Sequence, residues 1–243
     1  MLARGAAAAG LFLIMEALSG SLPVPAYRWF AAAFGALLLV SCGPRLVTAQ
    51  TERPVSEPYT GSTNIFEYPG RDQRLQIDRV MDELQIQAGK TVADIGAGGG
   101  WFAVRAARRV RPGGRVYAVE INDKFLATIA TRARREGYDN IETVLGEPGD
   151  PKLPKGSVDA VLLLKTYHEV ADPVALLKNT RLALKPGGLV GIIDRNGTGG
   201  DHGLDRSVVI KEAKIAGFEL VRSFDFVKAD EQDYFLIFKA TAS

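Results

Sequence analysis

Hydrophobic and polar positions change period repeatedly after about residue 65, and each change marks an expected element. Apolar residues at helical spacing predict an amphipathic helix over residues 73–85, whose apolar positions are Ile77, Val80, Met81 and Leu84. Short apolar runs predict buried strands, with helices between them. The expected strands are residues 91–95, 115–121, 141–146, 158–164, 189–194, 218–227 and 234–240. The other expected helices are residues 101–110, 122–137, 172–184 and 205–217.

The alternation of strand and helix predicts a largely parallel sheet with helices on both faces. Helix boundaries agree with it: Asp172 is an expected N-cap before Pro173, and Gly137 ends the helix expected over residues 122–137. The last two strands lie close together in the sequence, which favours an antiparallel pair. We therefore expect an α/β fold with a doubly wound sheet of about seven strands, the last of them antiparallel.

Residues 1–50 have a different pattern, with almost no charge and two apolar runs at residues 6–15 and 29–40. Each run is shorter than the roughly 18 residues typical of a membrane span. The second follows Arg28 and ends in small residues, which is typical of a signal peptide, so residues 1–50 are expected to be a signal or anchor segment. Three endings stay open: a lipoprotein-type site that would lipidate Cys42, ordinary cleavage after residues 47–49, or an uncleaved anchor.

The next stretch, residues 51–64, is rich in proline, serine and threonine and is expected to be a linker to a domain over residues 65–243. A hydrophobic content of 47% over 243 residues supports a packed core. Outside residues 1–50 the basic and acidic residues are equal in number, which disfavours nucleic-acid binding.

Cysteine and histidine are scarce in the chain. Cys42 is the single cysteine, which excludes an internal disulfide and any multi-cysteine zinc site. Only two histidines are present, His168 and His202, so no metal site built from histidine and cysteine is expected, although a carboxylate site stays open.

The stretch "VADIGAGGGWF", residues 92–102, places a glycine-rich turn directly after an expected buried strand. In α/β sheets the ligand lies beyond the carboxyl ends of the strands, and glycine lets the backbone approach it closely. A dinucleotide site expects a third glycine where Trp101 stands. Asp94, two positions before Gly96, would repel a phosphate and attract a cation. The pattern therefore favours a ligand with a positive amine and no phosphate.

This stretch resembles motif I of the class I S-adenosylmethionine-dependent methyltransferases, and the resemblance covers about residues 65–243. It implies a Rossmann-like methyltransferase sheet and S-adenosylmethionine as the cofactor. In that family an acid at the position of Glu120 binds the ribose hydroxyls, and one at Glu147, or alternatively Asp150, receives the adenine amino group. The expected cofactor-binding residues are Asp94, Gly96, Ala97, Gly98, Gly100, Glu120, Ile121, Glu147 and Lys165.

The segment "KTYHEV" resembles a bacterial group of predicted methyltransferases that carry Tyr-His-Asp or Tyr-His-Glu after the fourth strand and often have export signals. The resemblance implies that Tyr167 and His168 face the transferable methyl group. They are the expected catalytic residues, with His168 as a candidate general base because an imidazole has a pKa of about 6.5. A role in ordering the loop or contacting the cofactor is the alternative for His168. Glu169 is expected to cap or pair locally.

Other polar residues near the strand ends carry weaker signals. Asp194 and Asn196 are candidates for substrate contact or loop hydrogen bonding, and His202 is expected to be a mobile loop residue. An arginine cluster is expected to form a solvated helix face, with attraction to anionic lipid as the alternative. Its members are Arg105, Arg108, Arg109 and Arg111.

Missing motifs narrow the acceptor. No "NPPY"-type element follows the fourth strand, Lys165 stands where catechol methyltransferases place a magnesium-binding acid, and the cysteines of arsenite methylation are lacking. We therefore expect methyl transfer to a small-molecule or lipid-like acceptor. The alternatives are a non-catalytic cofactor-binding module and a nicotinamide-dependent oxidoreductase. Membrane association through residues 1–50 or export is expected, with the side of the membrane left open.

Overall fold

The computed structural model describes residues 53–242, so the expected signal or anchor segment lies outside the described residues. None of the helices within 53–242 has the length and apolar character that crossing a membrane requires.

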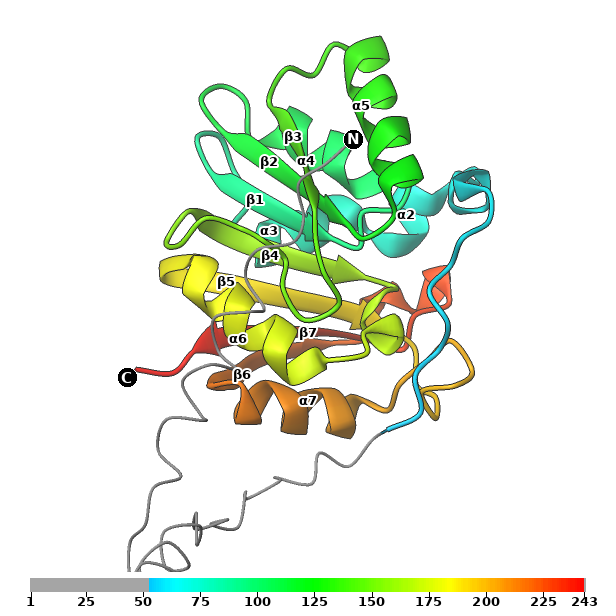
Figure 1. Ribbon diagram of the computed structural model, residues 1–243, viewed down its shortest axis with the longest axis vertical. Helices are drawn as coiled ribbons and strands as arrows, with labels where there is room; N and C mark the ends of the chain where they lie inside the picture. The colour runs from blue at the N-terminus through cyan, green and yellow to red at the C-terminus, as the bar shows by residue number, and fades with distance from the viewer. Residues whose placement is uncertain (1–52, 243) are drawn as a thin grey trace, which may run out of the picture. The chain divides into compact units, whose positions relative to one another are not determined.

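Seven strands form one sheet in the order β3-β2-β1-β4-β5-β7-β6 (Figure 1). The first five strands pair in parallel, and β7 runs antiparallel to both β5 and β6. The expected α/β sheet with an antiparallel last strand is therefore confirmed. The strands are β1 (Thr91–Ile95), β2 (Arg115–Glu120), β3 (Ile141–Leu145), β4 (Val158–Leu164), β5 (Leu184–Asp194), β6 (Phe218–Phe224) and β7 (Tyr234–Ala240).

Helices cover both faces of this sheet (Figure 1). Residues of α3, α4 and α5 join one buried cluster, and residues of α6 and α7 join the other. The α-helices are α2 (Arg71–Leu75), α3 (Ile77–Glu83), α4 (Trp101–Arg109), α5 (Asp123–Glu136), α6 (Pro173–Ala183) and α7 (Arg206–Ile215). Three short 3-10 helices are η2 (Thr63–Phe66), η3 (Tyr167–Glu169) and η4 (Phe226–Asp230).

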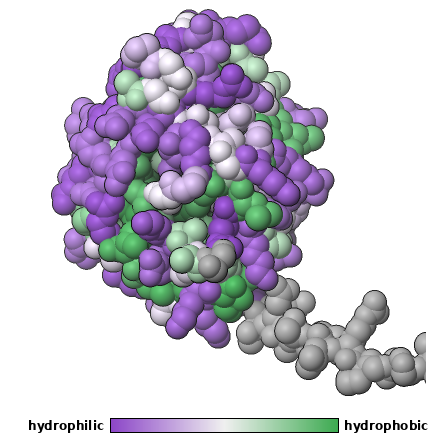
Figure 2. All heavy atoms as spheres, turned by 90° about the vertical axis from the view of Figure 1, so that its left-hand side faces the viewer, coloured by the Kyte–Doolittle hydropathy of each residue, from purple (hydrophilic) through white to green (hydrophobic). Residues whose placement is uncertain are grey.

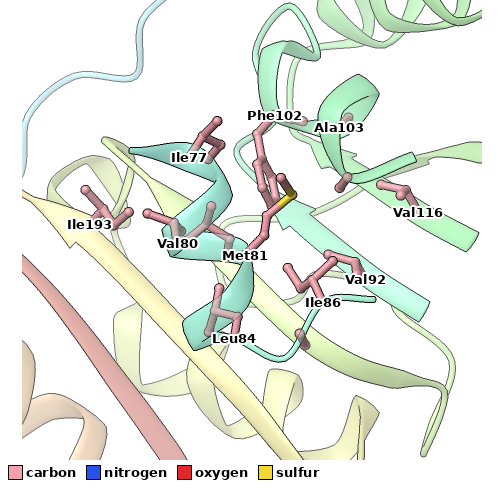
Figure 3. Close-up of a cluster of buried hydrophobic side chains, with 14 of the residues drawn as sticks. Ile77, Val80, Met81, Leu84, Ile86, Val92, Phe102, Ala103, Val116 and Ile193 are labelled. Carbon is pink, nitrogen blue, oxygen red and sulfur yellow. The ribbon is translucent and has the colours of Figure 1, made fainter. Parts of the chain in front are cut away.

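The central strands are buried on both faces, which explains their continuous apolar sequences. In β4, Leu162 belongs to one cluster, whereas its neighbours Val161 and Leu163 belong to the other. Figure 3 shows Met81 of α3 pointing toward Phe102 of α4 between helix and sheet. Side chains that alternate in this way bury both faces of the sheet and leave its strand ends available for a ligand.

The expected single helix over residues 73–85 is wrong, because the structure has two helices, α2 and α3. Gln76 separates them with a φ of 52°, in the left-handed region. Its side-chain amide donates to the carbonyl of Phe226. The break turns α2 so that Arg71 and Leu75 are buried, although neither belongs to the apolar stripe of α3.

Two expected strand boundaries also differ. The "KPGG" segment, expected to end the preceding helix, lies inside β5, where the register shifts between Val158 and Ala160 of the neighbouring β4. An irregularity of this kind accommodates extra residues without ending the strand. At the other end of the sheet, β6 ends at Phe224, and residues 226–230 form η4 instead of continuing the strand.

Residues 53–66, which we call the strap, cross the carboxyl ends of the strands and appear as the cyan segment at the right of Figure 1. The described part of the expected linker, residues 53–64, packs on the domain. Ser56 is buried, and its backbone N–H donates to the carbonyl of His168 over 3.2 Å. Proline- and serine-rich sequence lacks an apolar period, yet it packs here through hydrogen bonds that such a period does not reveal.

The side of the domain away from the strap is mainly hydrophilic, with small hydrophobic patches (Figure 2). Scattered exposed apolar residues are normal for a folded surface. The strap side, where the strands end, is where a ligand site is expected in such a sheet.

Candidate active site

A cavity of about 480 Å³ lies at the carboxyl ends of β1, β2 and β4. Its size falls in the range of small-molecule sites, about 300–1,000 Å³. Its walls come from the glycine-rich turn, the residues after β2, β3 and β4, part of the strap, and Arg71. This is the position at which the strand order reverses, where doubly wound sheets bind their ligands.

The glycines of the turn have different structural roles. Gly96 has a φ of 75°, and a Cβ there would lie 2.3 Å from Oγ1 of Thr166, so this position needs the missing side chain. A Cβ on Gly98 would meet nothing within 4 Å, because its backbone borders the cavity. Gly100 does not line the cavity, and a Cβ there would approach Ile129 of α5 to 3.3 Å. Gly100 therefore acts through packing.

Glu120, at the end of β2, presents a carboxylate that the backbone holds in place. One oxygen accepts from the N–H of Gly98 over 2.9 Å. The other accepts from the N–H groups of Ile121 and Asn122 over 2.8 and 3.2 Å. A carboxylate has about four acceptor positions, so Glu120 retains capacity toward the cavity it lines. This fixed acceptor suits a hydroxyl donor of the ligand.

Asp94, near the end of β1, is buried at the wall of the same cavity. Its Oδ2 has no hydrogen-bond partner among the described residues. Burial, followed by the nearby Glu120 carboxylate, raises the pKa of Asp94 to about 7. A buried carboxylate oxygen without a donor is costly, so a cationic or hydrogen-bonding ligand group would be favoured there.

The turn after β3 carries the two acids considered for the adenine amino group, Glu147 and Asp150. Glu147 lines the cavity and Asp150 does not. Their backbones form a bridge, with the N–H of Glu147 donating to the carbonyl of Asp150 over 2.8 Å. Lys152 pairs with both carboxylates, at 3.1 and 3.0 Å. The geometry therefore favours Glu147 for a contact with the ligand.

Two cations reach the cavity, and the sequence indicated only one of them. Arg71 is buried, lies 4.0 Å above the Trp101 ring and favours the ionised form of Asp94. Lys165, an expected cofactor residue, also lines the cavity, where burial and then Arg71 lower its pKa. No sequence motif indicated Arg71. It reaches the cavity through the break between the helices at Gln76, which no local pattern predicts. Together the two cations offer a place for a ligand carboxylate.

The four arginines on and just after α4 differ in their exposure and in their partners. Arg105 pairs with Asp72 at 2.7 Å and stacks on Trp101 at 3.9 Å, whereas Arg109 pairs with Asp82. Arg111 pairs with Asp139, and Arg108 is exposed. The expected solvated face therefore holds for the exposed Arg108 and Arg111, whereas Arg105 and Arg109 are partly buried.

Tyr167 lies outside the cavity lining, although the resemblance implied that it faces the methyl group. Its ring is fully buried, and its hydroxyl donates to Oε2 of Glu212 over 2.9 Å. Arg53 of the strap pairs with the other oxygen of Glu212 and donates to the carbonyl of Tyr167. Burial and Glu212 raise the pKa of Tyr167 well above its usual value. The geometry makes Tyr167 a positioning residue.

His168 is buried behind the cavity wall and is bound to Asp194. Its Nδ1 lies 2.9 Å from each Asp194 oxygen. Because an ionised carboxylate only accepts, Nδ1 is the donor in this contact. Nε2 lies 3.8 Å from Oε1 of Glu169, which lines the cavity. Asp194 is fully buried, so it orients His168 and does not provide the substrate contact considered for it.

Two further residues of the loop after β5 can now be placed. His202 lies with its ring 5.8 Å from that of His168 at an interplanar angle of 87°. Its backbone N–H donates to Oγ of Ser56, and Arg195 donates to its carbonyl, so the loop is held at this point. Asn196 donates its N–H to Asp233 and accepts from the N–H of Arg206, which is the loop hydrogen bonding expected as the alternative.

Comparisons with known proteins agree with this geometry. Residues 93–192 match a family model described as a methyltransferase domain. Nocamycin O-methyltransferase of Saccharothrix syringae is 30% identical over 114 residues, covering 47% of this chain and 41% of that protein. Ubiquinone biosynthesis O-methyltransferase of Caulobacter vibrioides is 34% identical over 116 residues, covering 45% of this chain and 42% of that protein. The matches thus span less than half the length of either curated relative.

Among solved structures, a SAM-dependent methyltransferase from Aquifex aeolicus superposes with a TM-score of 0.66 at 22% identity. The superposition covers 72% of this chain and 95% of the other. The superposed part of the chain therefore has the fold of that SAM-dependent methyltransferase, and residues 93–192 match the sequence of a methyltransferase domain.

Proposed function

We propose that this chain is an S-adenosylmethionine-dependent methyltransferase that acts on a small-molecule or lipid-like acceptor. The observation that carries the proposal is the pair of carboxylates at the glycine-rich turn. Glu120 is fixed by three backbone donors, whereas the buried Oδ2 of Asp94 has no partner among the described residues. One carboxylate fits a ribose diol and the other fits an ammonium group.

The remaining walls fit the other parts of the cofactor. Glu147 and Ile121 border the end of the cavity beyond β2 and β3, where the adenine would lie. Arg71 and Lys165 suit the cofactor's carboxylate. Gly98 leaves bare backbone between Asp94 and Glu120, so that the cofactor can approach the turn. When bound, the cofactor supplies an activated methyl group on a sulfonium.

The nicotinamide alternative is not favoured by this arrangement. A pyrophosphate would have to lie beside the anionic pair Asp94 and Glu120. Trp101, which replaces the third glycine of a dinucleotide turn, is buried between the guanidinium groups of Arg71 and Arg105. A phosphate at this turn would therefore meet two carboxylates and the Trp101 ring in place of a third glycine.

We propose an oxygen atom as the methyl acceptor, bound beside Glu169. The two curated relatives described above are named O-methyltransferases, which supports oxygen. The acceptor oxygen loses its proton and forms a bond to the methyl carbon as the carbon–sulfur bond breaks. The electron pair of that bond stays on sulfur, so the products are a methyl ether or ester and S-adenosylhomocysteine. Apolar walls suit an aromatic or lipid-like acceptor, and they include Pro58, Tyr59, Phe66, Val170 and Leu176.

His168 is the proposed acceptor-side positioning residue, because it lies behind the cavity wall with its Nε2 3.8 Å from Oε1 of Glu169 at the rim. Tyr167 supports it by fixing η3 through Glu212 and Arg53. The protein groups at this end are therefore held in place, and the acceptor is the group that has to be positioned for methyl transfer.

The location of the reaction is proposed from sequence alone. Residues 1–50 would attach the domain to a membrane or direct its export, and such a location suits a lipid-like acceptor. A reporter fused after residue 60 would report the compartment. Activity of the reporter in the soluble cytoplasmic fraction alone would contradict this proposal.

The reaction can be tested without knowing the acceptor. Full-length protein is incubated with S-adenosylmethionine labelled in the methyl group and with small-molecule and lipid extracts. We expect label in an extract compound with the wild-type protein and none above background with Glu120→Ala. Equal labelling with both proteins would contradict the proposal. Label that appears in every extract only in hydrolysis products of S-adenosylmethionine would also contradict it.

A further inference from the structure

We infer that His168, Glu169 and His202 form a binding site for a divalent transition-metal ion at the acceptor end of the cavity. One ligand atom from each residue, a ring nitrogen or a carboxylate oxygen, lies within 4.8 Å of the others. Around a metal at about 2.0–2.2 Å from its ligands, neighbouring ligand atoms are roughly 3.0–3.5 Å apart. Small side-chain rotations therefore suffice to close the three groups on one ion.

The environment of His168 is the strongest support. A metal-binding histidine usually donates its second ring N–H to a carboxylate, which fixes the ring and its tautomer. Asp194 performs this role, since both of its oxygens lie 2.9 Å from Nδ1. Asp194 is itself fixed by the N–H of Arg195 over 2.9 Å. Nε2, the ring nitrogen not bound to Asp194, lies 3.8 Å from Oε1 of Glu169.

His202 is held opposite His168 by several contacts of its backbone. Its φ of 58° is in the left-handed region, a conformation that persists in a residue with a side chain where the surroundings impose it. Ser56 supplies part of that constraint: Oγ accepts from the N–H of His202 over 2.9 Å and donates to the carbonyl of Gly199 over 2.7 Å. The backbone N–H of Ser56 donates to the carbonyl of His168. One strap residue thus fixes both histidines.

The chemistry of these ligands points to the class of metal. Two imidazoles and one carboxylate suit Zn²⁺, Fe²⁺ or Co²⁺ better than Mg²⁺ or Ca²⁺, which prefer oxygen ligands. Three protein ligands leave coordination positions open for another molecule. Glu169 borders the cavity, so an open position would face the bound acceptor.

The catalytic consequence rests on the proposed methyltransferase function, whereas metal binding itself does not. A divalent ion lowers the pKa of a hydroxyl that it coordinates. The acceptor hydroxyl would release its proton to solvent and attack the methyl carbon as an oxyanion. In this account His168 acts as a metal ligand and not as the base.

Metal binding is tested by calorimetric titration of the chelator-treated full chain, prepared without a histidine tag, with Zn²⁺. We expect one equivalent to bind, and His202→Ala to lower the affinity by roughly 100-fold, since it removes one ligand. Asp194→Asn should lower it by about 10–100-fold, the usual effect of losing the group behind a ligand. His202 is exposed, so its replacement leaves the buried clusters intact.

Two controls separate the possible outcomes. Cys42→Ser should bind Zn²⁺ like the wild type, which excludes the thiol, and Glu147→Gln should keep the zinc affinity because it lies at the cofactor end. Cofactor binding is measured in the same protein with chelator present. Absence of a bound equivalent, equal affinity in His202→Ala, or dependence on Cys42 would overturn the metal site while leaving the methyltransferase proposal intact. Zinc binding without cofactor binding would overturn the methyltransferase proposal alone.

Discussion

The two ends of the cavity are built in different ways. The donor end, around Asp94 and Glu120, comes from β1, β2 and the turn between them, within a short stretch of sequence. The acceptor end joins η3 to the strap and to the loop that holds His202. Backbone N–H groups fix the donor end, whereas side chains far apart in sequence fix the acceptor end.

This difference separates binding from selection of the acceptor. A donor end made from a local motif is suited to a constant ligand, because its geometry follows from the strand ends and the turn. An acceptor end assembled from the strap and loops can change without disturbing the sheet. Substitutions at the two ends should therefore have separable effects on cofactor affinity and on acceptor-side properties.

The largest expected effect is at Glu120. Glu120→Ala removes a charged acceptor for a ribose hydroxyl, worth about 1.5–3 kcal/mol, so affinity for S-adenosylhomocysteine should fall by roughly 10- to 100-fold. Calorimetry measures this change. Glu142→Ala, which removes an exposed carboxylate on the neighbouring β3, is the matched control and should keep the affinity. A similar loss in both variants would refute a specific role for Glu120.

Asp94 should show a conflict between stability and binding. Its pKa is about 7 in the folded protein, against 3.8 for an ordinary aspartate, so the folded state binds more protons between these values. The free energy of unfolding contributed by this group therefore falls as pH rises from about 4 to about 7.

Asp94→Asn removes that penalty and should raise the free energy of unfolding at pH 8 by up to about 4 kcal/mol, at 1.36 kcal/mol per pKa unit. The same change should weaken cofactor binding, because the ammonium loses its counter-charge. Chemical denaturation at pH 4 and pH 8 tests the first effect, and calorimetry tests the second. A variant less stable than the wild type at pH 8 would contradict this account of Asp94.

The glycine turn offers a matched pair. Gly98 and Gly89 both have positive φ, at 52° and 80°, and a Cβ on either would meet no atom within 4 Å, but only Gly98 lines the cavity. Each substitution by alanine should cost about 1 kcal/mol of stability, from strain in the left-handed region. Only Gly98→Ala should lower cofactor affinity, by about 10-fold or more, since its methyl group would enter the cavity. Equal affinities in the two variants would place the cofactor elsewhere.

The smallest effect is expected at the strap. Ser56→Ala removes the contacts of Oγ with His202 and Gly199, at a cost of about 1–2 kcal/mol. Amide exchange should become faster in residues 199–203, while affinity for S-adenosylhomocysteine stays within two-fold, a limit of about 0.4 kcal/mol. Ser223→Ala, on the exposed surface of β6, is the control and should leave exchange in this loop unchanged. Loss of cofactor affinity in Ser56→Ala would show that the two ends are not separable.

The predictability of each end follows the same division. The strands, and the glycines that follow β1, were predictable because buried strands and tight turns impose local sequence patterns. Asp94 was identified from its position before the glycines, and Glu120 from the resemblance to the methyltransferase family. Arg71 was not, because it reaches the cavity through the break at Gln76, and nothing in the helical period indicates a left-handed residue there.

The acceptor end was harder to predict for a physical reason. "KTYHEV" indicated the segment after β4, but sequence could not show that Tyr167 turns toward Glu212 while His168 turns toward Asp194. The approach of His202 to His168 depends on Ser56, which lies in a segment expected to be a linker. Contacts of this kind are set by tertiary packing, and they leave no period in the sequence.

The most direct test of the central claim is a titration of the wild-type full chain with S-adenosylmethionine and, separately, with a reduced nicotinamide dinucleotide. We expect S-adenosylmethionine to bind one equivalent in calorimetry and the nicotinamide dinucleotide to show no change in fluorescence. Binding of the nicotinamide dinucleotide with no binding of S-adenosylmethionine would contradict the assignment of Asp94 and Glu120 to a methyl donor.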